Sequence, residues 1–245
     1  MSHLRRAMIL AAGLGTRMAP LTLETPKPLV KLGGKPLIDY AIERLVAGGV
    51  DFIVVNVHYK ADQLIAHIDR KRKELPKVKF VISDETEELL DTGAGVKKAL
   101  PLFEGEAFLT YNSDSLWIEG MGSSLTRMQS RWNPETMDAL MLLAPCATAI
   151  GYDGRGDFEM DAWGRLKRRP EMNIAPFVWT GVQIVQSSLF QDAPEGRFSI
   201  NRQWDRSMSE GRLWGVRLDG VWIHVGTPQG LEEAEEFLRD LARAP

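Results

Sequence analysis

Short apolar runs and helical apolar stripes alternate along the first half of this 245-residue chain. Continuous apolar runs predict buried β-strands at residues 8–12, 52–55, 78–82 and 107–111. Between the first three runs, apolar side chains recur at three- and four-residue spacing and predict amphipathic helices at residues 36–47 and 61–74. Such alternation favours parallel strand pairing through right-handed crossovers. The pattern therefore predicts an α/β fold, doubly wound around a mostly parallel central sheet.

The second half of the chain has a less regular pattern. It predicts strands at residues 139–143 and 177–185 and helices at residues 122–132, 201–211 and 229–243. The glycine-rich stretch 150–175 predicts a small hairpin insertion that covers the ligand site of the sheet. The hexapeptide repeats that indicate an appended β-helix are missing from the sequence. We expect a single domain over residues 1–245, without a C-terminal β-helix.

The first predicted strand runs into a glycine loop that is followed by two spaced cations. Gly13 and Gly15 can adopt backbone angles closed to residues with a Cβ, so the amide groups of this loop can lie against an anion. Arg17 offers a planar fork of donors to phosphoryl oxygens, and Lys27 offers a compact point charge. The prolines that flank Lys27 predict a stiff extended segment rather than a helix. We interpret the loop as a phosphate site rather than a polar surface loop.

Two other phosphate-binding motifs do not fit this loop. The P-loop pattern G-x-x-x-x-G-K-[ST] is not matched by the residues after Gly13. A dinucleotide fingerprint requires a third glycine where this chain has Met18. In addition, both motifs require a helix to open directly after the turn, which the proline-containing continuation does not predict.

The overall charge and the single cysteine limit the class of protein. Thirty Lys and Arg against 33 Asp and Glu give a net charge of −3, so no global basic field favours nucleic acid as a partner. Cys146 is the only cysteine, and no Cys/His cluster indicates zinc. The sequence begins without an apolar signal region and contains no apolar run long enough to span a bilayer. We expect a cytoplasmic protein without a membrane partner.

Polar residues follow two of the predicted strands at their carboxyl ends, where ligands bind in such sheets. Asp114 comes just after the fourth strand, and a carboxylate there is costly to desolvate unless it is paired or bound to a cation. It is our first candidate metal ligand. Asn112 at the same strand end is expected to contact either a nucleotide ribose or a sugar. His58 follows the second strand, where a structural role is favoured over a functional one.

Residues 10–30, LAAGLGTRMAPLTLETPKPLV, resemble the signature of the sugar-1-phosphate nucleotidyltransferases, also called NDP-sugar pyrophosphorylases. The likeness extends from about residue 7 to the final helix. It implies a Rossmann-like nucleotidyltransferase fold and the reaction of a nucleoside triphosphate with a sugar 1-phosphate to give a nucleotide sugar and pyrophosphate. Chain length and the segments PKPLVKLGGKPLIDYAIERL, FLTYNSDSLW and VGTP resemble, within this family, the N-acetylmuramate α-1-phosphate uridylyltransferases.

The resemblance implies site residues by position. Arg17 and Lys27 fall at the catalytic positions. The residues at nucleotide-binding positions are Leu10, Ala11, Gly13, Gly15, Thr16, Gly93, Ala94, Gly95 and Asn112. The residues at sugar-binding positions are Glu171, Asn173, Thr180 and Gly181. An ordinary glycine-containing helix start is the alternative interpretation of residues 93–95.

The chain departs from the family pattern at the second metal-ligand position. Relatives commonly have Asp where this sequence has His224, and neutral imidazole is a poor ligand for the Mg²⁺ that the family implies. Three explanations stay open. Asp114 holds the metal with phosphate oxygens and water, another carboxylate such as Asp219 or Asp205 compensates, or a softer cation such as Mn²⁺ is accepted. Two smaller departures are Ser113 in place of Gly and the segment 168–171 in place of Glu-Lys-Pro.

The resemblance leaves the substrates open. UTP and N-acetylmuramate α-1-phosphate are expected, with mannose-1-phosphate guanylyl transfer and glucose-1-phosphate thymidylyl transfer as alternatives. An alternative of another class is a catalytically silent nucleotide-sugar sensor, which His224 favours. Arg202 and Arg206 lie on one face of a predicted helix, where they either face solvent or meet a substrate carboxylate. We expect a monomer or a small homo-oligomer.

Overall fold

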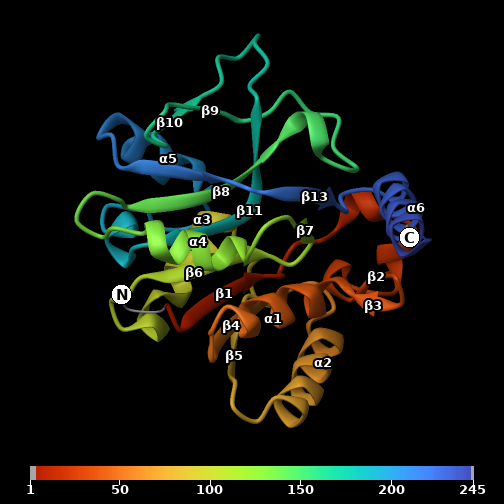
Figure 1. Ribbon diagram of the computed structural model, residues 1–245. Coiled ribbons are helices and arrows are strands. Elements are labelled where there is room, and N and C mark those ends of the chain that lie inside the picture. Colours follow the sequence, from red (N-terminus) through yellow and green to blue (C-terminus); the bar gives the residue numbers. More distant parts are fainter. Residues whose placement is uncertain (1–3, 244–245) are drawn as a thin grey trace.

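A nine-stranded mixed sheet forms the centre of the computed structural model, which describes residues 4–243 (Figure 1). Its main strand order is β10-β9-β11-β6-β1-β4-β5, and β8 pairs with both β11 and β12. The strands are β1 (Arg6–Leu10), β4 (Phe52–Val57), β5 (Lys79–Asp84), β6 (Phe108–Asn112), β8 (Ala139–Pro145), β9 (Phe158–Met160), β10 (Leu166–Arg168), β11 (Phe177–Val185) and β12 (Leu213–Arg217). The central strands β6, β1, β4 and β5 run parallel, whereas β11 is antiparallel to both β6 and β8.

Helices cover both faces of this sheet. They are α1 (Leu37–Ala47), α2 (Ala61–Glu74), α3 (Thr92–Ala99), α4 (Ser124–Arg131), α5 (Asn201–Ser209) and α6 (Pro228–Arg243). Alternate residues of β1 separate the two layers: Ala7 and Ile9 pack with α1, α2 and α4, whereas Met8 packs with α3 and α5. The predicted doubly wound fold with parallel central strands is confirmed. None of the described helices combines the length and the apolar character that crossing a bilayer requires.

Two small antiparallel sheets complete the architecture beside the central one. One pairs β7 (Ser115–Glu119) with β13 (Gly220–His224), and the other pairs β2 (Lys31–Leu32) with β3 (Lys35–Pro36). The C-terminal helix α6 lies against β2 (Figure 1), and its Ala234 joins a third apolar cluster with Leu32 and Ile223. The last part of the chain is thereby held next to the loop that follows β1.

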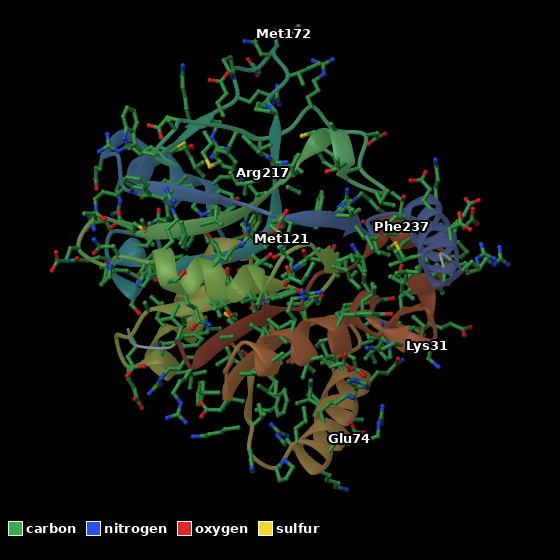
Figure 2. The ribbon with its side chains drawn as sticks, in the orientation of Figure 1. Lys31, Glu74, Met121, Met172, Arg217 and Phe237 are labelled. Carbon is green, nitrogen blue, oxygen red and sulfur yellow. The ribbon has the colours of Figure 1, made fainter. Side chains whose placement is uncertain are left out.

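The hairpin predicted within residues 150–175 is formed by β9 and β10, and it extends the edge of the main sheet through β11. The loop that follows β10 leaves Met172 and Ile174 exposed. Met172 lies at the opposite end of the molecule from Glu74 of α2 (Figure 2).

The segment around Lys27 differs from its prediction. Lys27 opens a single 3₁₀ turn, η3 (Lys27–Leu29), instead of lying on an extended stretch. Pro26 is extended, but Pro28 sits in the turn, where its fixed φ is compatible and its missing N–H costs nothing. Two other 3₁₀ turns, η1 (Thr16–Met18) and η2 (Leu21–Leu23), follow the glycine loop. No α-helix opens there, as expected.

Candidate active site

A cavity of about 420 Å³ opens at the carboxyl ends of the parallel strands β1, β4 and β6. The glycine loop with Arg17 forms one wall, and Lys27 lies beside it. Residues 89–92 and Asn56 form another wall, and residues 112–114 close a third. The cavity therefore collects the predicted phosphate loop, both predicted catalytic cations and the predicted metal ligand Asp114.

Gly15 gives the glycine loop its shape. It adopts a left-handed conformation with φ +66°, and a Cβ there would lie 3.0 Å from Cβ of Lys27 and from Cγ2 of Thr22. The Thr22 hydroxyl and the Met18 amide both donate to the Gly15 carbonyl, at 2.9 Å each. Gly13, in contrast, has open space beside it. The backbone is therefore fixed by close contacts at Gly15 and accessible at Gly13. Leu10, Ala11 and Thr16 line the cavity beside these two glycines.

Lys27 and Asp114 form an ion pair inside the cavity. Nζ of Lys27 lies 2.5 Å from Oδ2 of Asp114, and the two side chains are 13% and 21% exposed. Burial by itself raises the pKa of Asp114, but the charge and hydrogen bond of Lys27 outweigh it and hold that pKa below its usual value. The carboxylate is therefore ionised at neutral pH.

His224 reaches the same region from the small β7–β13 sheet, where it pairs with Ser115, the residue after Asp114. Burial lowers the pKa of His224, and Lys27 and Arg17 lower it further against the opposing effect of Asp114. The imidazole is therefore neutral at pH 7. His224 and Arg17 also line a second cavity of about 620 Å³ between α6 and residues 149–154.

The protein ligands near Asp114 fit a divalent cation whose other ligands are water molecules and substrate oxygens. In residues 4–243 no three His, Cys, Asp or Glu side chains converge to hold a metal by themselves. One ionised carboxylate, with substrate phosphates, is a donor set that Mg²⁺ uses. Of the two carboxylates considered as compensation, Asp205 pairs with Arg168 and Asp219 accepts from the Met121 amide, and neither lines the cavity.

Asn112 lines the cavity and carries a side-chain acceptor that is not used within residues 4–243. Its side-chain oxygen is buried and has no hydrogen-bond partner among the described residues. Gly181 backs it: the register of β11 against β8 shifts here, φ of Gly181 is +90°, and a Cβ would lie 2.8 Å from Cβ of Asn112. Thr180 is committed inside the protein, since its hydroxyl donates to the Leu142 carbonyl at 2.9 Å.

Residues 93–95 form the first turn of α3 and lie behind the cavity wall rather than in it. The amides of Gly93 and Ala94 donate to the Phe198 carbonyl, and a Cβ on Gly93 would lie 2.5 Å from the Phe198 ring. A Cβ on Gly95 would lie 2.8 Å from Oε1 of Glu85. The missing side chains make room for protein packing, while the preceding residues 89–92 line the cavity.

The remaining predicted sugar-binding residues, Glu171 and Asn173, lie in the exposed loop after β10 and do not line the cavity. Arg169 organises this loop by donating to the carbonyls of both residues, at 2.8 and 2.9 Å. Arg206 is committed as well, because it pairs with Asp192 at 3.0 Å.

A buried relay next to the glycine loop was not predicted. The Ala11 amide donates to Oδ1 of Asn56 at 2.6 Å, and Nδ2 of Asn56 donates to Oε1 of Glu85 at 2.8 Å. The second oxygen of Glu85 accepts from the Leu90 amide at 3.3 Å. Burial raises the pKa of Glu85. His58 bonds the Glu85 carbonyl at 2.7 Å, which agrees with the structural role favoured for it. The relay ties the wall formed by the glycine loop to the wall formed by Asn56 and residues 89–92.

The fold and this site define a nucleotidyl-transferring protein, and the comparison with known families agrees. The chain belongs to the nucleotidyl transferase family, whose profile matches residues 6–240. The predicted family is therefore confirmed.

The curated relatives of this chain include two enzymes of one name. The N-acetylmuramate alpha-1-phosphate uridylyltransferase of Caulobacter vibrioides is 43% identical over 96% of this chain and 97% of its own length. The enzyme of the same name from Neisseria meningitidis serogroup B is 32% identical over 94% and 96%.

Solved structures agree with the fold. A UDP-glucose pyrophosphorylase complexed with UDP-glucose superimposes with a TM-score of 0.76 at 18% identity, covering 97% of this chain and 99% of its own. HddC from Yersinia pseudotuberculosis superimposes with a TM-score of 0.73 at 24% identity, covering 96% and 100%.

Proposed function

We propose that this protein transfers a uridylyl group from UTP to N-acetylmuramate α-1-phosphate, giving UDP-N-acetylmuramate and pyrophosphate. The 43% identity to the Caulobacter vibrioides enzyme over almost the whole of both chains supports this substrate pair. The observation that carries the chemistry is the single cavity in which Arg17, Lys27 and Asp114 meet the glycine loop. We place the protein in the cytoplasm, as a monomer or small homo-oligomer without nucleic-acid or membrane partners.

In this reaction a phosphate oxygen of the sugar attacks the α-phosphorus of UTP. A new P–O bond forms, the bond to the β-phosphate oxygen breaks, and pyrophosphate leaves with its electron pair. Both reactants are anions, so alignment and countercharge supply most of the catalysis. Arg17 and Lys27 are assigned to neutralise charge on the phosphates, and the accessible backbone at Gly13 is assigned to the α-phosphate.

Asn112 is assigned to the ribose or the sugar through its buried, unpartnered oxygen. Leu10, Ala11, Gly15 and Thr16 are proposed to line the nucleotide. Residues 93–95 are proposed to act on it indirectly, by positioning residues 89–92. Gly181 is proposed to shape the sugar side by backing Asn112. Thr180 supports that strand. Glu171 and Asn173 are proposed to contact the sugar when their exposed loop approaches the cavity in the complex.

A divalent cation, Mg²⁺ or Mn²⁺, would be held by Asp114, with His224 beside it. When bound, it supplies positive charge to the phosphates. Without substrate, Lys27 neutralises the Asp114 carboxylate. We propose that the bound triphosphate attracts the Lys27 ammonium and leaves Asp114 available to hold the cation.

The proposal is tested by measuring pyrophosphate release by the purified protein with four triphosphates against a panel of sugar 1-phosphates. The expected result is the highest kcat/KM for UTP with N-acetylmuramate α-1-phosphate. A higher value for GTP with mannose 1-phosphate, or dTTP with glucose 1-phosphate, would replace the substrates and keep the chemistry. Release with no pair, despite measurable nucleotide-sugar binding, would indicate a sensor and contradict the proposed function.

A further inference from the structure

An arginine that the sequence pattern does not single out lines the nucleotide cavity from a distant part of the chain. Arg197 lies in the loop between η6 (Ser187–Phe190) and α5, and it faces the cavity together with Thr92 and Asp114. Its side chain forms no hydrogen bond or ion pair with residues 4–243. An uncommitted guanidinium at the wall of a substrate cavity is available to bind an anion.

The backbone around Arg197 is nevertheless firmly placed. The carbonyl of the next residue, Phe198, accepts from the amides of Gly93 and Ala94, each at 3.1 Å, and the Ile200 amide donates to the Thr92 hydroxyl at 3.3 Å. The Phe198 ring is buried over Gly93. The loop is thus docked on the start of α3, while the Arg197 side chain remains uncommitted.

Three other arginines between residues 168 and 206 are already engaged. Arg206 pairs with Asp192 and Arg168 pairs with Asp205. Arg169 donates to backbone carbonyls of its own loop. Arg202 is exposed on α5 and does not line the cavity. Arg197 is therefore the cation of this region that is placed to meet a substrate.

The position of Arg197 separates it from the cations assigned to phosphate. Arg17 and Lys27 belong to the segment after β1, whereas Arg197 is attached to α3 and lines the same cavity as Asn112, which is assigned to the ribose or the sugar. The cavity therefore offers positive charge from two different walls. A substrate with an anionic group besides its phosphate satisfies both.

We propose that Arg197 is a specificity-determining residue that binds the carboxylate of an acidic sugar 1-phosphate. The inference rests on the proposed function, because N-acetylmuramate carries a carboxylate that N-acetylglucosamine does not. A planar guanidinium can bind that carboxylate through two parallel N–H···O bonds. Neutral sugars leave Arg197 without this partner.

The test compares wild type, Arg197→Gln, Arg197→Lys and the matched control Arg202→Gln. Pyrophosphate release is measured with UTP and either N-acetylmuramate α-1-phosphate or N-acetylglucosamine α-1-phosphate. Arg197→Gln is expected to lower kcat/KM for the acidic sugar by about tenfold to a hundredfold, the effect of losing a hydrogen bond to a charged group. The kcat/KM for the neutral sugar and the KM for UTP should stay within about twofold, because neither substrate has the carboxylate that Arg197 is proposed to bind. Arg197→Lys should fall between, and Arg202→Gln should match wild type.

Several results would overturn this assignment. Equal losses for both sugars or a raised KM for UTP would place Arg197 on the phosphates, and unchanged kinetics would place it outside the site. Thermal unfolding midpoints of the variants check that each is folded. If the wild-type protein turns over other sugar 1-phosphates but not the acidic one, the proposed function and this inference are both wrong. If the wild-type protein prefers the acidic sugar and Arg197→Gln keeps that preference, only this inference is wrong.

Discussion

At the scale of single residues, Lys27 and Asp114 neutralise one another across the cavity. We expect Lys27→Ala to lower the rate of pyrophosphate release about a hundredfold, or about 3 kcal/mol, because one preorganised countercharge to the transition state is lost. Lys31→Ala, which removes an exposed lysine four residues away, is the matched control and should retain the wild-type rate. A Lys27→Ala protein that turns over at the wild-type rate would refute the assignment.

Removing Lys27 also leaves the Asp114 carboxylate without its partner in a partly buried site. Urea unfolding of the same variant therefore has to accompany the kinetics. A rate loss in protein that is fully folded under assay conditions separates the catalytic role of Lys27 from its structural role.

Position 224 is the proposed second metal-ligand position, and it carries an imidazole instead of an oxygen ligand. We expect His224→Asp to lower the Mg²⁺ concentration for half-maximal activity on the order of tenfold, because Mg²⁺ prefers carboxylate to imidazole. Magnesium titrations of pyrophosphate release, together with Mn²⁺ binding followed by electron paramagnetic resonance, measure the effect. Unchanged affinity for both metals would show that position 224 does not contact the cation.

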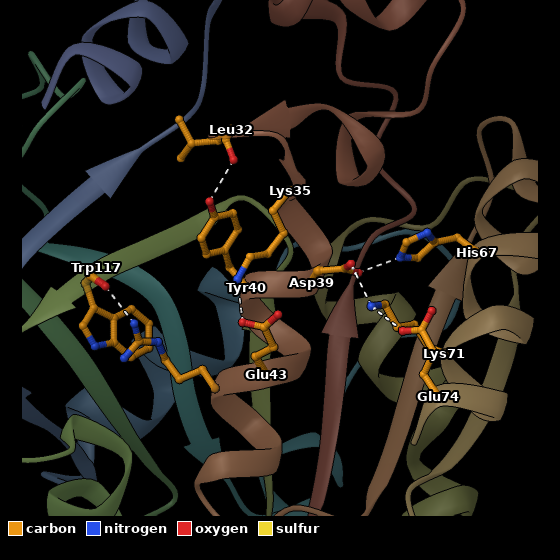
Figure 3. A network of polar contacts seen from close by, with 10 residues as sticks. Leu32, Lys35, Asp39, Tyr40, Glu43, His67, Lys71, Glu74 and Trp117 are labelled. Atoms are coloured by element: carbon orange, nitrogen blue, oxygen red, sulfur yellow. Dashed lines mark hydrogen bonds and ion pairs between the residues drawn. The ribbon is translucent and has the colours of Figure 1, made fainter. Parts of the chain in front are cut away.

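At the scale of elements, a buried polar network joins α1 to α2 (Figure 3). Asp39 on α1 accepts from Nε2 of His67 at 2.6 Å and from Nζ of Lys71 at 2.9 Å, both on α2. Lys71 also bonds Glu74. Burial raises the pKa of Asp39, but its bonds to His67 and Lys71 outweigh burial and hold the pKa below its usual value. The network fixes α2 against α1.

We expect Asp39→Asn to destabilise the protein by about 3 kcal/mol at pH 7, because it removes one charge of a buried set. A folded-state pKa below the ordinary value of about 3.9 contributes stability above that pH, and this stability is lost as the pH falls through the folded-state pKa. The difference between wild type and variant in urea unfolding should therefore shrink below about pH 4.

The control for this experiment is Glu43→Gln on the same helix, which removes the partner of the more exposed Lys35 (Figure 3) and should change stability by less than about 1 kcal/mol. An Asp39→Asn penalty that is the same at pH 3 and pH 7 would contradict the electrostatic explanation.

Regular elements with a clear hydrophobic period were predictable from the sequence. The helix at residues 61–74 and the strand at residues 177–185 coincide with α2 and β11. Short strands were missed: β7 and β12 are each only five residues long, and β7 begins directly after the polar residues 112–114 that were interpreted as a site loop. Local propensity also misplaced Lys27, because its prolines are compatible with a 3₁₀ turn as well as with an extended chain.

The candidate site was predictable where its residues belong to a sequence motif or follow directly after a predicted strand. The glycine loop, Lys27 and Asp114 meet as expected because parallel strands end at one edge. Arg197 was not predictable, since it reaches the cavity through the docking of Phe198 on α3, a contact between segments about a hundred residues apart. Nor was the Asn56–Glu85 relay, because both side chains look like ordinary polar residues at strand ends.

At the scale of the whole molecule, the cavity is assembled from elements spread over most of the sequence, so ligand binding should stabilise the entire fold. UTP with Mg²⁺ at about a hundred times its Kd should add about 2.7 kcal/mol to the free energy of unfolding. Thermal unfolding at increasing UTP measures this gain, and Lys27→Ala should need more UTP for the same shift. A midpoint that does not move with UTP would contradict nucleotide binding at this site.

The register of β13 on β7 sets His224 opposite Ser115, next to Asp114, and Gly226 then reaches the cavity. Gly13 and Gly226 both line the cavity, so the cavity is complete only once β13 has paired with β7. A ribosome-bound chain that stops before β13 would hold the phosphate loop, residues 89–92 and residues 112–114, but neither His224 nor Gly226. In a translation time course, turnover should therefore not appear before β13 has emerged and paired with β7.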